Sequence, residues 1–296
     1  MSKRLVLTLA FLITNIVCYS MAFADLSDGL IAYYPFNGNA NDESENLNHG
    51  TVYQAVLHND RFGTPQSAYK FDGSNDYISV ASNTLFDVNE ITLSAWINVA
   101  AFPLTGDSGK IVMRDDTASS RIFQFRVLQD GTIGFIALDK PVTSWDINVV
   151  TTKQIELDQW YHVVATFDET KGGNIWVNAE NWGYDNEFSG SLSSGTAPIV
   201  LGGSSINPKA LNGILDDVRI YNRCLSDIEI KELYSYPQCI NLTEKPFTFS
   251  PGTPARASEV NENFDILYNQ VNKLTCEIGI LKTIVCQDHP DLELCK

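Results

Sequence analysis

Basic residues and cysteines are both scarce in this chain. Its 296 residues hold 20 Lys and Arg against 36 Asp and Glu, a net charge of −16. Such an acidic chain is repelled by nucleic acid and by anionic membranes, so neither is expected as a partner. The six cysteines form no C-x-x-C motif and the four histidines are scattered, which argues against zinc. The balance of charge suits calcium and an extracellular setting instead.

Sequence motifs of common catalytic sites are also missing. There is no G-x-S-x-G, no H-E-x-x-H and no phosphate-binding loop. A serine hydrolase, a zinc protease and a nucleotide hydrolase of the usual kinds are therefore not indicated. We expect a protein that is not an enzyme.

The N-terminus has the features of a secretion signal. Lys3 and Arg4 supply positive charge, Leu5–Val17 is apolar, and Ala22–Ala24 forms an A-x-A cleavage site. The apolar run is too short to span a membrane. We therefore predict a signal peptide over residues 1–24 and no membrane span. The mature protein would be secreted, extracellular or on the cell surface, with the periplasm as an open alternative.

Short strands and turns dominate the next part of the chain, from residue 25 to residue 238. Ile91–Val99 alternates strictly between apolar and polar residues, which is typical of a strand with one buried face. Hairpin signals join residues 121–128 to 132–138 and residues 160–167 to 174–180, and a tight turn joins residues 69–71 to 77–80. Helical patterns are almost absent. The pattern predicts an all-β fold, a two-sheet antiparallel sandwich or jelly roll. The strands are expected near residues 30–36, 69–71, 77–80, 91–99, 121–128, 132–138, 160–167, 174–180 and 199–201.

The segment Gly213–Leu233 should begin as a strand and end as a helix. Alternation places Asp216 on one face with Ile214, Val218 and Ile220. A carboxylate facing a core is costly unless a cation or donors compensate it. The helix should start at a capping box of the form S-x-x-E, made by Ser226 and Glu229.

Taken together, five motifs resemble the LamG-like jelly roll of the concanavalin A-like lectin/glucanase superfamily. The resemblance implies two curved antiparallel sheets with termini on neighbouring strands. It implies no single activity, because this fold includes lectins, carbohydrate-binding modules, adhesive domains and some glycosidases. The motifs, in chain order, lie at Ala32–Gly50, Phe71–Ile78, Ile91–Ile97, Trp160–Asp168 and Gly213–Tyr234.

A structural calcium ion (Ca²⁺) is the first site hypothesis. Oxygen-bearing side chains follow the first strand and recur later, and several hard oxygen ligands suit calcium. The resemblance implies a calcium near the aspartate that matches Asp216, where it would join the two ends of the domain. The alternative is that Asp42 and Asp72 serve turns, while Asp216 pairs with backbone amides or an arginine. The proposed ligands are Asn37, Asp42, Asp72 and Asp216, with Asn48 nearby.

A glycan site is the second hypothesis. Trp182 and Tyr184 stand beside Asn186 in the segment Asn178–Phe188, and aromatic rings with amides and carboxylates suit sugars. Trp145, in a polar loop, is a further candidate. We therefore predict recognition of a glycan or an extracellular surface ligand. The alternative is a structural or adhesive scaffold without a sugar site.

Catalysis is the third hypothesis and the least favoured. The resemblance implies that glucanases of this fold carry acid, base and nucleophile carboxylates on one strand face. The nearest match is Glu156-Leu157-Asp158, but Trp160 and Tyr161 stand where the third carboxylate should be. A glycosidase thus remains an alternative with an incomplete site.

Beyond the jelly roll the composition changes. Residues 239–257 contain three prolines and read as a linker, and residues 286–296 form a cysteine-containing tail. Between them, residues 258–285 carry an unbroken heptad seam that predicts a coiled-coil helix and a homo-oligomer. A dimer and a trimer both remain open, and so does a helix docked on its own jelly roll. Multivalency through such a helix would strengthen ligand binding.

Five cysteines follow the signal peptide, all in the last third of the chain. In a secreted protein they favour disulfides, although sequence alone does not fix the connectivity. Cys224 and Cys239 bracket the predicted short helix, and Cys286 and Cys295 bracket the C-terminal loop. Cys276 is left over and could bond another chain.

Overall fold

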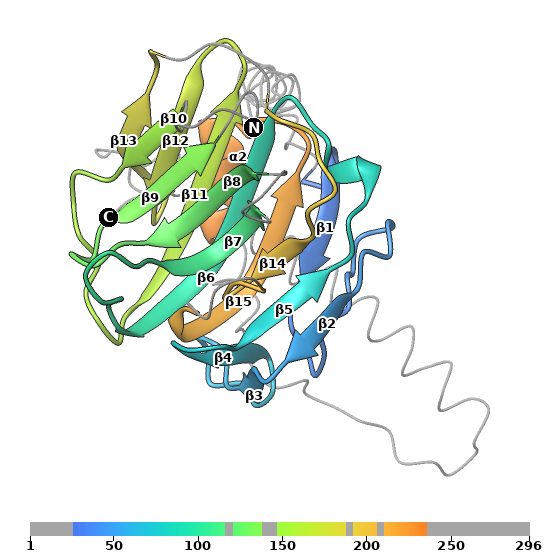
Figure 1. Ribbon diagram of the computed structural model, residues 1–296, viewed down its shortest axis with the longest axis vertical. Helices are drawn as coiled ribbons and strands as arrows, with labels where there is room; N and C mark the ends of the chain where they lie inside the picture. The colour runs from blue at the N-terminus through green and yellow to red at the C-terminus, as the bar shows by residue number, and fades with distance from the viewer. Residues whose placement is uncertain (1–25, 116–120, 138–146, 188–191, 206–209, 236–296) are drawn as a thin grey trace, which may run out of the picture.

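A computed structural model gives the fold as two antiparallel β-sheets packed face to face (Figure 1). It describes residues 26–115, 121–137, 147–187, 192–205 and 210–235. One sheet has the order β13-β12-β11-β6-β15-β4-β3, with β1 also paired to β15, and is called the eight-stranded sheet. The other, the seven-stranded sheet, has the order β10-β9-β8-β7-β14-β5-β2. The predicted jelly-roll sandwich is confirmed.

Each sheet is built from strands that are far apart in the chain. The eight-stranded sheet contains β1 (Leu30–Tyr34), β3 (Val56–His58), β4 (Ala68–Asp72), β6 (Ile91–Ala101), β11 (Trp160–Asp168), β12 (Gly172–Val177), β13 (Glu180–Asp185) and β15 (Asn212–Tyr221). The seven-stranded sheet contains β2 (Gly50–Tyr53), β5 (Tyr77–Val80), β7 (Gly109–Asp115), β8 (Arg121–Val127), β9 (Ile133–Ala137), β10 (Ile147–Val150) and β14 (Ile199–Leu201). A 3-10 turn, η1 (Thr84–Phe86), and helix α2 (Asp227–Ser235) complete the described elements.

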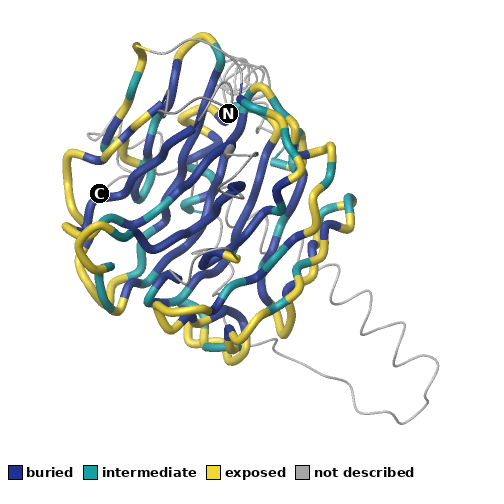
Figure 2. The backbone as a smooth tube through the Cα atoms, viewed as in Figure 1, coloured by how far each residue is buried: buried dark blue, intermediate teal, exposed yellow. Residues whose placement is uncertain are grey.

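The hydrophobic core lies between the two sheets, where the chain is buried in Figure 2. The alternation predicted for β6 is seen there, because Leu93, Ala95 and Ile97 enter this core while Ser94 and Trp96 point to the outer face. Phenylalanines from both sheets fill the centre. The fully buried strand phenylalanines are Phe71, Phe123, Phe125, Phe135 and Phe167.

Two of the predicted turns join paired strands and one does not. Strands β8 and β9 pair with each other, and so do β11 and β12, as expected for hairpins. Strands β4 and β5 were expected to be joined by a tight turn as neighbours. They lie in different sheets, so the turn after Asp72 is a corner that carries the chain from one sheet to the other.

Strand β15 departs from simple alternation in its middle. Asp216 lies opposite Trp96, on the outer face of the eight-stranded sheet. The register then shifts between Asp216 and Arg219. Asp217, at the shift, has a φ of 48°. This is a β-bulge, which adds a residue to one strand and turns the following side chains over.

The bulge corrects the predicted faces of β15. Leu215 packs into the inter-sheet core before the bulge, and Val218 and Ile220 pack into it after the bulge. Ile214 is only half-buried and points to the outer face with Asp216. The sequence predicted one core-facing side for the alternating residues of this strand, Ile214, Asp216, Val218 and Ile220. That prediction is wrong for Ile214 and Asp216.

Helix α2 follows β15 and starts with the predicted capping box. The backbone N–H of Ser226 donates to the Glu229 carboxylate at 2.7 Å, and the N–H of Glu229 faces the Ser226 hydroxyl at 3.4 Å. Both bonds satisfy donors that a helix start would otherwise leave free. The helix is thereby fixed at the end of the domain.

Several predicted segments lie outside the described residues. They are the signal peptide, the linker 239–257, the coiled-coil segment 258–285 and the tail 286–296. Within the described ranges, no helix is long and apolar enough to cross a membrane.

Candidate functional site

The outer face of the eight-stranded sheet is covered on one side by helix α2. Ile230 and Leu233 of the helix pack on Val164 of β11 and Tyr221 of β15, and all four are buried. Trp176 of β12 borders this cluster and is half-buried. The helix thus covers the face over β11 and β15 and reaches Trp176 at the border of β12.

Beneath the helix lies a layer of stacked rings. Trp96 contacts His162 with ring centroids 5.3 Å apart, and Tyr234 of α2 stacks on Trp96 at 5.7 Å. The Ser94 hydroxyl and His162 Nε2 are 2.9 Å apart. Burial lowers the pKa of His162 to about 3, so the ring is neutral. Ser94 and His162 are almost completely buried, so this pair is not accessible to a substrate.

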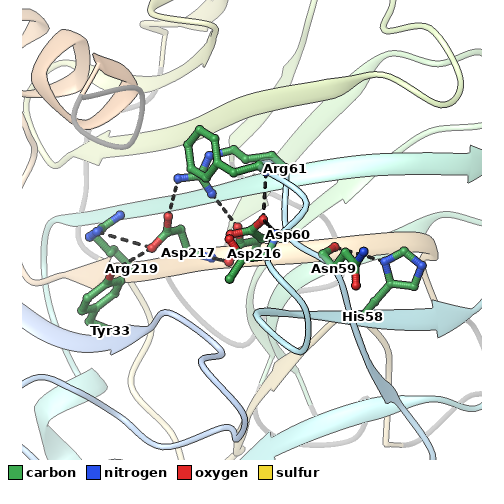
Figure 3. Close-up of polar contacts among 10 residues, drawn as sticks. Tyr33, His58, Asn59, Asp60, Arg61, Asp216, Asp217 and Arg219 are labelled. Carbon is green, nitrogen blue, oxygen red and sulfur yellow. Dashed lines mark hydrogen bonds and ion pairs between the residues drawn. The ribbon is translucent and has the colours of Figure 1, made fainter. Parts of the chain in front are cut away.

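Arg61 sits at the edge of this layer and binds the bulge of β15 (Figure 3). Its guanidinium contacts Asp216 at 2.5 Å and Asp217 at 2.6 Å. The same group lies over the rings of Phe62 and Trp96, 4.5 and 4.6 Å from their centroids. This buried cation compensates Asp216, which is the arginine alternative weighed in the sequence analysis.

Asp216 and Asp217 are adjacent in the sequence and share the Arg61 guanidinium. The pKa of Asp216 is raised, whereas the pKa of Asp217 is lowered. Burial and the neighbouring charge of Asp217 raise the pKa of Asp216. Burial acts the same way on Asp217, but Arg219 and Arg61 outweigh it and hold the pKa of Asp217 below its usual value. The Tyr33 hydroxyl donates to Asp217 at 2.7 Å and fixes its second oxygen. The cluster therefore holds β1, β15 and the loop before β4 together.

The residues predicted to bind calcium already have protein partners in several places. Asp42 accepts hydrogen bonds from the backbone N–H groups of Tyr33, Ser44 and Asn48. Asp72 accepts from Ser74 in a turn. Asn37 is exposed. Asp216 faces Arg61. Among the described residues, no three His, Cys, Asp or Glu side chains are grouped as metal ligands. The residues as placed do not fit one calcium ion, and calcium remains a prediction without a direct test.

The predicted glycan residues on β13 point in different directions. A register shift beside Trp182 turns its ring toward the inter-sheet core, where it is half-buried. Its Nε1 donates to Glu180 at 2.9 Å, and the Lys153 ammonium lies 5.2 Å from the ring centroid. Lys153 also pairs with Glu180 at 2.6 Å. Trp182 is therefore partly enclosed by its neighbours.

Tyr184 is the exposed aromatic residue of this edge strand. It is 70% exposed and lies directly opposite Asn174 of β12. Residues directly opposite in a sheet point to the same face, so Tyr184 belongs to the outer face near Trp176. The Asn174 amide oxygen accepts a bond from the Asn181 side chain at 3.1 Å. Asn186, beyond the strand, is exposed.

A cavity of about 580 Å³ opens between β11, β12 and the start of α2. Its wall combines the Trp176 ring, the Asn174 amide and several carboxylates. Asp168 accepts bonds from Thr170 and Lys171, and these partners overcome burial to lower its pKa to about 2. The lining residues that carry the chemistry are Trp176, Asn174, Thr166, Asp168, Glu90 and Asp227.

The sequence analysis did not identify Trp176 or Arg61. Trp176 stands between Ile175 and Val177, so a continuous apolar run hides that its ring points outward while its neighbours enter the core. Arg61 lies 155 positions before Asp216, and no local pattern connects the two. The one sequence feature that indicated a buried cation was the acidic pair Asp216-Asp217 inside a strand.

The nearest match to a catalytic carboxylate set lies on a turn. Glu156 and Asp158 are exposed and precede β11, and Asp158 has a φ of 57°. The Tyr161 hydroxyl accepts from the backbone N–H of Glu156 at 3.1 Å. The two carboxylates are thus in a loop rather than on the strand face that a glucanase would need.

Some predicted residues fall outside the described part of the chain, namely Trp145, Cys239, Cys286 and Cys295. Cys224 is described and half-buried, and burial raises the pKa of its thiol. The predicted disulfide pairs Cys224–Cys239 and Cys286–Cys295 remain predictions.

Comparison with known proteins gives the family. The model of the concanavalin A-like lectin/glucanases superfamily matches residues 72–231, more than half of the chain. The chain belongs to this superfamily. The LamG-like resemblance is thereby confirmed. No curated protein matches the chain.

Solved structures resemble this superfamily member at low sequence identity, and the likeness shows the fold alone. The binding domain of Paraclostridial Mosquitocidal Protein 1 has a TM-score of 0.58 at 20% identity, covering 71% of this chain and 53% of its own. Domain 4 of AbnA, an extracellular GH43 arabinanase from Geobacillus stearothermophilus, in complex with arabinotriose, has a TM-score of 0.57 at 18% identity, covering 69% and 98%. Botulinum neurotoxin type C, which depends on two ganglioside molecules for entering cells, has a TM-score of 0.55 at 14% identity, covering 72% and 52%. The chain thus spans about half the length of the two toxin structures.

Proposed function

We propose that the chain is a carbohydrate-binding module whose site is the open part of the eight-stranded sheet. The observation that carries the proposal is the cavity of about 580 Å³ beside Trp176. Asn174 lines this cavity, and the exposed Tyr184 lies directly opposite Asn174 on the next strand. Aromatic rings stack on the apolar faces of sugars, and amides and carboxylates take sugar hydroxyls. A pocket of this volume accepts a small oligosaccharide segment.

The similar structures support the ligand class. One of them was solved with arabinotriose, and another protein depends on gangliosides. The lining of the cavity in this chain contains four carboxylates against a single Lys171, namely Glu90, Asp168, Asp227 and Glu229. We infer that the preferred glycan is uncharged, because anionic sugars would meet like charges. Of the residues predicted from sequence, Tyr184 remains in this site, while Trp182 and Asn186 are proposed to contribute at the neighbouring edge. Trp145 lies outside the described residues and remains a sequence-based candidate.

A glycan array tests the proposal with three variants. Tyr184→Ala and Asn174→Ala should each lower the array signal about tenfold or more, because both remove direct contacts. Tyr53→Ala is a matched control, since Tyr53 is a 43% exposed tyrosine on the other sheet. Equal signals from all four proteins would refute the site. Thermal melting of each variant separates lost binding from lost folding.

Secretion and oligomerisation form a second part of the proposal. The leader at residues 1–24 supports export, and the heptad seam at 258–285 supports a homo-oligomer that presents several sugar sites. The molecular mass in solution, with and without reductant, tests the seam and the cysteines together. A monomeric mass in both conditions would refute oligomerisation.

We also propose that the module lacks catalytic activity. This proposal rests on the loop position of Glu156 and Asp158 and on the buried Ser94–His162 pair. A scaffold without a sugar site is the alternative that a blank array would favour. Release of reducing sugar from polysaccharides would instead show a glycosidase and refute the proposal.

A further inference from the structure

A second cavity lies at one end of the sandwich, away from helix α2. It is formed where the turn after β4, the loop between β6 and β7, and the start of β15 meet, at the lower end of the domain in Figure 1. Its volume is about 360 Å³. That volume is at the small end of ligand pockets and suits one ring-sized group.

The walls of this end cavity are mostly apolar. Val99, Val127 and Leu211 are buried members of the inter-sheet core, and Phe102 packs against that core from the loop after β6. Leu104 also lines the cavity and is 80% exposed, the largest exposed fraction among the large apolar residues described. An apolar ligand face could therefore be covered by Leu104 and Phe102 together.

Polar groups stand on the other side of the cavity. The Ser74 hydroxyl and the Asn212 amide line it, and within the described ranges neither side chain has a hydrogen bond. Asp107 adds the one ionisable side chain among the lining residues. The amide and hydroxyl offer both donors and acceptors to a ligand.

The backbone holds these polar groups in position. Gly73 has a φ of 82°, and a Cβ atom there would lie 2.8 Å from the Cβ of Asn212. The N–H of Gly73 donates to the carbonyl of Leu211 at 3.1 Å, and the N–H of Ala210 donates to the carbonyl of Ser74 at 3.2 Å. These bonds tie the turn to the start of β15, so a ligand would meet a preformed site.

We propose that the end cavity is a second carbohydrate site, which takes a single uncharged sugar ring. A pyranose has an apolar C–H face for Phe102 and Leu104 and a hydroxyl edge for Ser74 and Asn212. Among the lining residues, Asp107 is the one ionisable side chain, so the lining presents no cation to an acidic sugar. The proposal extends the glycan-binding function proposed above and takes its ligand class from it, but the two sites share no residue.

Titrations of the full chain with methyl glycosides of glucose, galactose, mannose and arabinose, followed by saturation-transfer NMR, test this site. We expect at least one glycoside to bind with millimolar affinity, and Leu104→Ser and Asn212→Ala each to weaken it about tenfold. Leu104 is too exposed for its loss to harm folding. Leu157→Ser, at a 40% exposed leucine before β11, is the matched control and should bind like the wild type.

The Tyr184→Ala variant separates this proposal from the first one. Glycoside binding that is unchanged in Tyr184→Ala but about tenfold weaker in both cavity variants supports the end site. Binding of wild-type affinity in both cavity variants overturns it, and so does the absence of any glycoside signal while the wild type still binds glycans on the array. A blank result in both assays overturns the two proposals together.

Discussion

Replacing Arg61 by methionine should strongly destabilise the domain. The Arg61 and Asp216 side chains are only 6% and 3% exposed, and Asp217 is 13% exposed. The variant therefore leaves two adjacent carboxylates buried with much less compensation. Breaking a buried ion pair on one side costs about 3–5 kcal/mol, more than the pair itself contributes. For a domain of this size, the melting temperature should fall by roughly 6–20 °C.

The dependence of this loss on pH identifies its cause. Burial already raises the pKa of Asp216, and losing Arg61 raises it further above the value of about 3.9 in the unfolded chain, while Arg219 still lowers the pKa of Asp217. The folded state then binds more protons than the unfolded state, so stability falls as the pH rises from about 4 upward. Lowering the pH should therefore narrow the difference between the variant and the wild type, because protonation removes the buried charges.

Thermal melting and urea unfolding between pH 5 and pH 8 would measure both effects. The double variant Arg61→Met/Asp216→Asn should recover part of the loss, since an amide carries no charge. Lys153→Met is the matched control: its pair with Glu180 is at least half exposed, and its loss should change stability by less than about 0.5 kcal/mol. An Arg61→Met variant that loses less than about 1 kcal/mol, or a loss that is the same at every pH, would refute the reasoning.

Three further predictions concern turns, caps and calcium. Ala179 has a φ of 62° in the β12–β13 turn, so Ala179→Gly should raise the free energy of unfolding by about 0.5–1 kcal/mol in urea titrations; a loss would show that the strain is absent. Ser226→Ala removes the capping box of α2 and should lower that free energy by about 1 kcal/mol, seen as a lower urea midpoint at unchanged slope. A calcium chelator should leave the melting temperature unchanged, because Asp42 and Asp216 already have protein partners; a clear fall would restore the calcium site predicted from sequence.

Most of the fold could be predicted from residue spacing. Strict alternation in Ile91–Val99 located β6, and the S-x-x-E pattern located the start of α2 to within a residue. Both signals are local, because each depends only on residues a few positions apart within one strand or one turn of a helix. The turn after Asp72 was predicted, but the two strands that it joins lie in different sheets. Whether such strands share a sheet depends on the strands with which each one pairs, and these are far away in the sequence.

The site was harder to predict because its geometry depends on bulges. One extra residue at Asp217 reverses the faces of β15, and a shift beside Trp182 turns that ring inward. The alternation of apolar and polar residues along a strand does not show where a bulge adds a residue, because the apolar pattern on either side of the bulge remains intact. Of the predicted glycan residues, Trp182 and Tyr184 therefore share strand β13, but only Tyr184 lies on the outer face, and their role in binding remains a prediction.

The two bulges divide the outer face of the eight-stranded sheet into parts with different roles. At β15 the bulge brings Asp216 and Asp217 to one side, where Arg61 neutralises them and the loop that carries it covers Trp96. Helix α2 closes the face from the other direction through Tyr234. Beyond this cover lie β12 and β13, where Trp176 is half-buried at the border of the helix cluster and Tyr184 is 70% exposed. The buried charge cluster thus supports the proposal of a glycan site at the edge of the sheet, and a variant that weakens the cluster should expose Trp96 without adding signal on a glycan array.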